Sequence, residues 1–88
     1  PELEDFLFDY EDLVDFKAEL VSEKDLDVFR LSIEVLHTGS PDQLARRITE
    51  DCKNKFEVTP SVVILKRGTL AQEFESSVKA PRFMDLRD

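Results

Sequence analysis

The chain of 88 residues suffices for one small domain, and its 41% hydrophobic and 36% charged residues are typical of a globular protein. No apolar run approaches the roughly 20 residues that a membrane-spanning helix requires, and no signal peptide opens the sequence. The net charge of −8 argues against a nucleic-acid partner, because phosphates require clustered Lys and Arg.

The counts of reactive residue types exclude several kinds of site. One cysteine, Cys52, excludes an internal disulfide framework and is consistent with a reducing cytoplasm. With only one histidine, the chain cannot build a zinc site from the usual nitrogen and sulfur ligands. Its two glycines exclude a glycine-rich phosphate-binding loop.

The first 35 residues predict a helix followed by a β-hairpin. In residues 1–10 the apolar positions follow the i, i+3, i+4, i+7 spacing of one helix face. Residues 14–20 and 29–35 alternate between apolar and polar side chains, as in strands with one buried face. The polar stretch 21–27 is expected to connect them, so the pair reads as an antiparallel hairpin.

The next segment predicts a second helix and a third strand. Ser40 is placed to cap the helix, Pro41 to occupy its first position and Gln43 to complete a capping box. The helix is expected to end before Pro60, and the apolar run 61–65 predicts a strand covered on both faces. Residues 69–88 show no convincing period and are predicted to form an irregular tail.

The order helix-strand-strand-helix-strand predicts an α+β two-layer sandwich with both helices on one face of the sheet. It is similar to a ferredoxin-like unit that lacks its first strand. Such a sheet would have lost a central strand, and we expect the resulting gap to favour a homodimer formed through the open sheet edge.

Most candidate reactive residues have a structural explanation. Cys52 lies on the apolar stripe of the second helix and is expected to be a buried thiol rather than a nucleophile. His37 follows a strand end and needs no catalytic role. The acidic residues around Asp12 and Asp15 are interpreted as a solvated junction, with weak calcium binding as the alternative. Lys79, in the tail, could neutralise charge on a phosphate, although a solvated lysine is the simpler interpretation.

Four stretches of the sequence together resemble the C-terminal domain of phenylacetate–coenzyme A ligases. Residues 56–65 read FEVTPSVVIL, residues 67–70 RGTL and residues 78–85 VKAPRFMD, where that family has VTPEVELV, PGSLP and GKAxRVxD. The opening PELEDFL is similar to the family's FPSxIEExL helix. The resemblance covers essentially the whole chain in order.

The resemblance implies that the chain is one part of an adenylate-forming enzyme. The C-terminal domain of such ligases acts as a mobile lid on a large N-terminal domain that binds ATP, Mg and an aryl acid. It closes to form the acyl-adenylate and then rotates to form the thioester with coenzyme A. The resemblance thus predicts one lid domain, 1–88, with a sandwich over about 1–68 and a tail over 69–88, in a cytoplasmic enzyme. The chain alone, which begins without Met, is expected to be an inactive fragment.

The resemblance also assigns two site residues. Lys79 matches the family's catalytic lysine, and Arg82 matches the arginine that follows it and is expected to support substrate binding. The sequence departs from the family pattern at Val78 and Ala71, where the family has glycine and proline.

Two alternatives remain at this point. One is an adenylating relative that acts on another acid or cofactor. The other is a regulatory ligand-binding module of the ACT kind, which shares the α+β sandwich and would give Lys79 no kinetic role.

Overall fold

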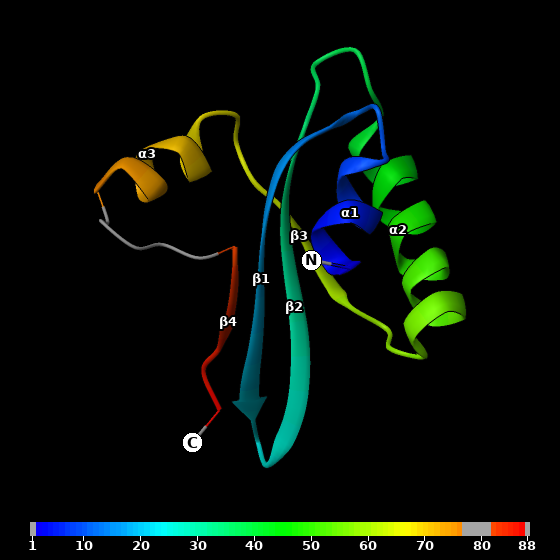
Figure 1. Cartoon of the computed structure of the whole chain (residues 1–88), viewed down its shortest axis with the longest axis vertical. Helices are drawn as coiled ribbons and strands as arrows, with labels where there is room; N and C mark the ends of the chain where they lie inside the picture. The colour runs from blue at the N-terminus through cyan, green and yellow to red at the C-terminus, as the bar shows by residue number, and fades with distance from the viewer. Residues whose placement is uncertain (1, 77–81, 88) are drawn as a thin grey trace.

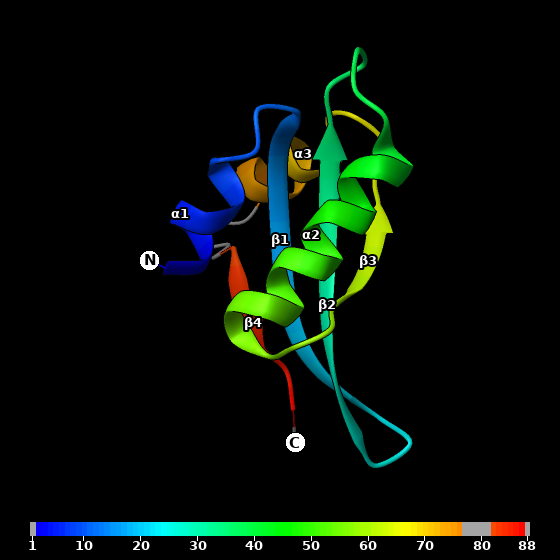
Figure 2. The ribbon, with the colours of Figure 1, turned by 90° about the vertical axis from the view of Figure 1, so that its right-hand side faces the viewer.

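The computed structural model describes residues 2–76 and 82–87, which form one sheet and three helices. The elements, in chain order, are α1 (Glu2–Phe8), β1 (Leu13–Glu23), β2 (Leu26–Val35), α2 (Pro41–Phe56), β3 (Ser61–Ile64), α3 (Thr69–Ser76) and β4 (Phe83–Asp85). Helices α1 and α2 lie together on one face of the sheet, whereas α3 lies on the other side (Figure 1, Figure 2). The α+β class, the predicted order of the first five elements and the shared face of the first two helices are confirmed.

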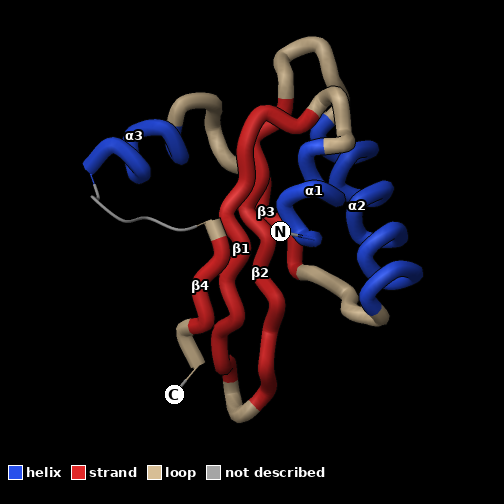
Figure 3. Tube along the Cα trace, in the orientation of Figure 1, coloured by secondary structure: helices blue, strands red, loops and turns tan. Residues whose placement is uncertain are grey.

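The β1–β2 hairpin forms the centre of the sheet, in the order β3-β2-β1-β4 (Figure 3). Its antiparallel pairing runs out to Glu23 opposite Leu26, so only Lys24 and Asp25 form the turn. Both turn residues have positive φ, 51° and 66°, as the tight turns favoured in hairpins require. The predicted connection 21–27 was therefore too long, because polar residues at the end of the hairpin pair as strand.

The predicted gap in the sheet is absent. Strand β3 pairs directly with β2 in parallel, from Ser61 beside Arg30 to Ile64 beside Ile33. This pairing provides hydrogen-bond partners for backbone groups that a missing central strand would have left open. The expectation of a gap was wrong, and the homodimer inferred from it stays a prediction. The expectation that this strand is covered on both faces was also wrong, because β3 lies at the sheet edge with Val63 and Ile64 exposed.

Helix α2 has the predicted start. The Ser40 side chain accepts a hydrogen bond from the Gln43 amide at 3.4 Å, and Pro41 is the first helical residue. The helix ends where Glu57 adopts a left-handed conformation, with φ 58°, and donates its amide to the Lys53 carbonyl. Its inner face carries the three buried side chains Leu44, Ile48 and Cys52.

The core fills the space between the sheet and the helices α1 and α2. Alternate residues of the hairpin face this layer, with Phe16 opposite Ile33 and Ala18 opposite Leu31. The core residues with no exposed surface are Leu7, Phe16, Ala18, Leu31, Ile33, Ile48 and Cys52. The hairpin residues between them point to the opposite face, which is polar and is the side on which α3 lies.

The expectation of an irregular tail was wrong for most of its described residues. Thr69–Ser76 forms α3, and Phe83–Asp85 forms β4, which pairs with β1 in parallel from Ala18 to Leu20. Helix α3 offers only Leu70 and Phe74 at helical spacing, and β4 has three residues, so neither gave a repeat long enough to predict it. Long-range contacts rather than local pattern hold both in place.

Candidate functional site

A buried carboxylate on the polar face of the sheet holds the start of α3. Glu34 of β2 is only 2% exposed. Its two carboxylate oxygens accept hydrogen bonds from the amides of Gly68, at 2.8 Å, and Leu70, at 2.6 Å. Amides at a helix start lack partners within the helix, and negative charge is favoured there. The Glu34 carboxylate therefore fixes the first turn of α3 to the sheet.

Two further contacts attach α3 to the same face. Leu70 is completely buried, and the Lys17 ammonium lies 2.9 Å from a Glu73 carboxylate oxygen. The turn that leads into the helix depends on Gly68, whose φ of +92° is unfavourable for residues with a Cβ. The position of α3 is thus set by β1, β2 and its own entry turn.

Arg82 lies in a cluster of side chains drawn from three elements. Its Nε is 2.9 Å from a carboxylate oxygen of Asp15, on β1. The guanidinium carbon lies 5.5 Å from the ring centre of Phe8 and 5.2 Å from that of Phe74. Both distances suit a cation–π interaction. The Arg82 side chain is therefore engaged within the chain itself.

Of the two predicted site residues, the structure describes Arg82 but not Lys79. Arg82 is placed as above, next to Asp15, which was interpreted from the sequence as part of a solvated junction. That interpretation was wrong for Asp15, whose carboxylate pairs with Arg82 and also accepts a hydrogen bond from the Phe16 amide at 2.8 Å. Lys79 and its neighbour Val78 lie outside the described residues, so the catalytic role of Lys79 stays a prediction.

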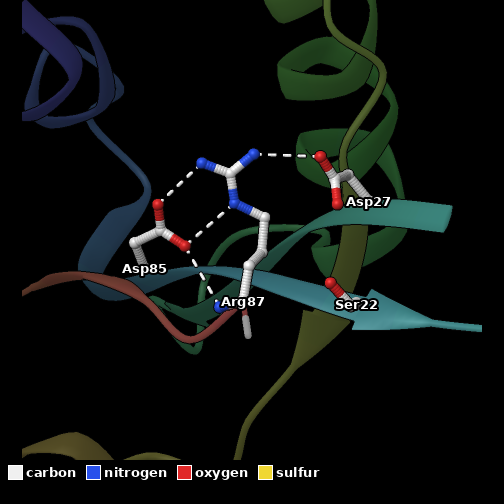
Figure 4. A pocket seen from close by; sticks show the side chains of 4 residues that line it. All are labelled: Ser22, Asp27, Asp85 and Arg87. Carbon is white, nitrogen blue, oxygen red and sulfur yellow. Dashed lines mark hydrogen bonds and ion pairs between the residues drawn. The ribbon is translucent and has the colours of Figure 1, made fainter. Parts of the chain in front are cut away.

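A second charged cluster lies where β4 ends beside the tip of the hairpin (Figure 4). The Arg87 guanidinium donates to Asp85 on one side, at 2.9 and 2.7 Å, and to Asp27 on the other, at 2.9 Å. Ser22 lines the same pocket. The hydrogen bonds from Arg87 hold the pKa of Asp85 at about 2. Since two carboxylates neutralise Arg87, this pocket ties the chain end to the hairpin and offers a ligand no unpaired positive charge.

Cys52 is a buried structural thiol, as expected. It is completely buried on α2, and burial, together with the nearby Asp51 carboxylate, raises the pKa of its thiol. A raised pKa leaves little of the reactive thiolate at neutral pH. His37, for which no function was expected, is exposed in the turn after β2.

The sequence predicted no zinc site of the usual nitrogen and sulfur ligands, and that stays a prediction. In the part of the chain that the structure describes, no group of three or more His, Cys, Asp or Glu side chains could hold a metal ion. The alternative of a weak calcium site near Asp12 and Asp15 therefore finds no support in residues 2–76 and 82–87.

Tyr10 should make the stability of the domain sensitive to alkaline pH. Its hydroxyl donates to the Asp51 carboxylate, and burial and this bond raise the pKa of Tyr10 above its ordinary value near 10. The folded state then holds the phenolic proton more tightly than the unfolded state. The contribution is complete below about pH 10 and is lost as pH rises above it.

Tyr10→Phe removes this titration. At pH 8 we expect the free energy of unfolding of the variant to be about 1 kcal/mol below that of the native chain, because the hydrogen bond is gone. Between pH 8 and pH 11 the free energy of unfolding should fall less in the variant than in the native chain. Urea unfolding of both proteins at the two pH values measures this. An equal loss in both proteins would contradict the role of Tyr10.

Comparisons with known proteins find similarity to solved structures. No family model matches this sequence, and no curated protein matches it. A domain of phenylacetate–coenzyme A ligase from Bacteroides vulgatus is similar, with a TM-score of 0.78 and 25% sequence identity. The match covers 99% of this chain and 82% of that domain. The predicted resemblance to a domain of phenylacetate–coenzyme A ligase is therefore confirmed.

Within residues 2–76 and 82–87, no helix has both the length and the apolar character needed to cross a membrane.

Sequence reasoning missed Glu34, Asp15 and Phe74 as residues that organise this region. Glu34 and Asp15 occupy polar positions of alternating strands, a pattern that indicates solvent exposure rather than burial under α3. Phe74 belongs to a segment without a detectable period. The sequence signal that could have indicated the turn before α3 is Gly68, one of the two glycines in the chain.

Proposed function

We propose that this chain is the C-terminal lid domain of an ATP-dependent phenylacetate–coenzyme A ligase. The observation that supports it is the similarity over 99% of the chain to a domain of such a ligase. The VTP, RGTL and KAPR motifs occur in the same order as in that family. In this proposal an aryl acid reacts with ATP to give an acyl-adenylate and pyrophosphate. Coenzyme A then displaces AMP to give the thioester.

Lys79 is the residue that we propose to act in the first step. Its ammonium donates hydrogen bonds to oxygens of the α-phosphate and of the departing pyrophosphate, where negative charge accumulates during the transfer. Fixed positive charge of this kind stabilises a transition state more than a ground state. A compact lysine charge on the lid would reach the phosphate only when the lid closes, which also excludes water.

The described residues suggest how the cofactors would be shared. Residues 2–76 and 82–87 hold no metal-binding group of carboxylates, and the sequence has no glycine-rich loop. ATP, Mg and coenzyme A are therefore proposed to bind mainly to a separate N-terminal domain. The present chain contributes the lysine and the surface that closes over them.

The adenylation half-reaction tests this proposal in the ligase that contains this chain. Lys79→Ala should lower the rate of phenylacetate-dependent pyrophosphate exchange about 100-fold, since removing one transition-state donor has an effect of this size. Thioester formation from preformed acyl-adenylate should be largely kept. Lys53→Ala, which removes an exposed lysine of α2, is the matched control and should leave exchange unchanged.

Other results would point to the alternatives. Exchange with a different acid but not with phenylacetate would indicate an adenylating relative. Normal exchange in Lys79→Ala would remove the catalytic role and favour the regulatory module. A ligase that retains exchange after loss of residues 1–88 would contradict the lid role in adenylation.

A further inference from the structure

We propose that two copies of this chain associate through the outer edge of β3, which pairs in antiparallel, two-fold fashion with β3 of the second copy. The sheet order β3-β2-β1-β4 makes β3 an edge strand, and Figure 2 shows it outermost beside β2. This surface differs from the gap that the sequence predicted, because it lies on the side of β3 that faces away from β2. The inference does not depend on the proposed role of Lys79.

Val62 and Ile64 turn their backbone groups away from the sheet. The Leu65 amide donates to the Ile33 carbonyl at 2.8 Å, so Leu65 points toward β2. Because backbone groups alternate in direction along a strand, those of Val63 also point toward β2, whereas those of Val62 and Ile64 point outward. In the part of the chain that the structure describes, β3 pairs with β2 alone. The outer edge therefore offers the amides and carbonyls of both residues to another strand.

The β3 edge lacks the features that usually prevent strand pairing. Natural edge strands carry charged side chains, bulges or proline where an incoming strand would pair. Residues 58–65 contain no charged residue, and their one proline, Pro60, precedes the strand. Val63 and Ile64 are 38% and 43% exposed, and Val58 is 39% exposed. Covering this edge would therefore remove apolar surface from water.

The charges that flank this edge indicate a second copy as the occupant. Glu57 precedes the uncharged stretch 58–65, and Lys66 and Arg67 follow it, all three with exposed side chains. Two copies aligned antiparallel place the acidic end of one edge beside the basic end of the other, at both ends of the pair. A parallel alignment would bring like charges together. The edge is therefore complementary to itself, as a two-fold interface requires.

The direction of the backbone groups also determines the register. The antiparallel register that uses both outward residues of each strand pairs Val62 of one copy with Ile64 of the other. Val63 then lies at the two-fold axis, opposite Val63 of the second copy, in a non-hydrogen-bonded pair whose side chains are close. Each copy has a single β3 edge, so the assembly stops at two copies. Because the contact is short, we expect weak association that depends on concentration.

Sedimentation of the 88-residue chain tests the contact. We expect the native chain to change from monomer to dimer between about 10 μM and about 1 mM, the range of a weak interface. Val63→Lys and Val63→Glu each place like charges opposite each other at the axis and should weaken dimerisation at least about tenfold. An equimolar mixture of the two variants should restore dimers, because Lys then faces Glu.

The control for these variants is Leu26→Lys, which changes an apolar side chain that is 69% exposed at the tip of the hairpin. It should leave dimerisation unchanged. A native chain that stays monomeric over the whole range would overturn the proposal, as would dimers that Val63→Lys does not weaken. Dimers that are weakened by both variants but not restored by mixing would overturn the placement of Val63 opposite itself. Restoration in the mixture would also show that both variants are folded.

A second pair of variants tests the antiparallel direction. Glu57→Lys places a positive charge beside the basic end of the second copy and should weaken dimerisation about fivefold, because an exposed ion pair is lost at both ends. Glu50→Lys makes the same change in net charge on the exposed side of α2 and should not weaken it. Equal effects of Glu57→Lys and Glu50→Lys would overturn the antiparallel arrangement.

Discussion

Replacing Glu34 by alanine is expected to lower the free energy of unfolding by about 2–4 kcal/mol. The carboxylate accepts hydrogen bonds from the Gly68 and Leu70 amides and is almost completely buried. Alanine leaves both amides without their partner, and the larger cost falls on the Leu70 amide, because Leu70 is completely buried whereas Gly68 is exposed. Each buried donor left unsatisfied costs about 1–3 kcal/mol, so the loss should be well above that of an ordinary surface change. Urea unfolding followed by circular dichroism measures it.

Two further variants show whether the hydrogen bonds cause this loss. Glu34→Gln keeps one acceptor oxygen but turns an amide group toward the second donor. Its free energy of unfolding should therefore lie between those of the native chain and of Glu34→Ala. Glu50→Ala removes an exposed glutamate of α2 and should change stability by less than about 0.5 kcal/mol. A Glu34→Ala loss no greater than that of Glu50→Ala would contradict the role of the carboxylate in holding α3.

Replacing Phe16 by alanine is expected to lower the free energy of unfolding by about 3–5 kcal/mol. Its ring has no exposed surface and lies on the face of β1 that meets the helices. The Phe8 ring is its neighbour, with the two ring centres 5.3 Å apart. Truncation removes the transfer free energy of the ring and leaves a cavity that the surrounding strands cannot close fully. Thermal and urea unfolding provide the measurement.

The matched control for Phe16 is a large apolar side chain outside the core. Leu26 follows the hairpin turn and is 69% exposed. Leu26→Ala should therefore change stability by less than about 0.5 kcal/mol. Phe16→Leu keeps much of the volume and should cost less than Phe16→Ala. A cost of Phe16→Ala below 1 kcal/mol would mean that the ring does not lie in the core as the structure places it.

The parts of the fold that were predictable are those with local rules. The alternation in 14–20 and 29–35 predicted the hairpin and its buried face, because a strand exposes alternate residues to opposite sides. The capping box at Ser40 predicted the start of α2 to the residue. Neither prediction needed information from distant parts of the chain.

The remaining features depend on contacts between residues far apart in sequence. Glu34 is separated by 34 and 36 residues from the amides it binds, and Asp15 by 67 residues from Arg82. Nothing in the local pattern of a strand distinguishes a polar residue that faces water from one that a later helix covers. The family resemblance identified Arg82 as a candidate residue but gave no indication that its partners belong to the same chain.

The same reasoning explains the wrong prediction of a gap. In a ferredoxin-like unit the first strand lies between two other strands of the sheet, so its absence predicted a gap. Whether β3 pairs directly with β2 depends on how the chain returns after α2. The apolar sequence 61–65 is compatible with direct pairing and with a position across a gap.

The three-residue pairing of β4 with β1 has a consequence for local unfolding. The hairpin pairs residues close in sequence, whereas β4 joins a strand more than 60 residues earlier in the chain, through the register Ala18–Phe83 to Leu20–Asp85. Short edge pairing of distant segments is the least costly part of a sheet to open. Strand β4 can therefore open without the rest of the sheet. Its amides should exchange with solvent by a partial opening, while the central hairpin and α2 exchange only when the whole domain unfolds.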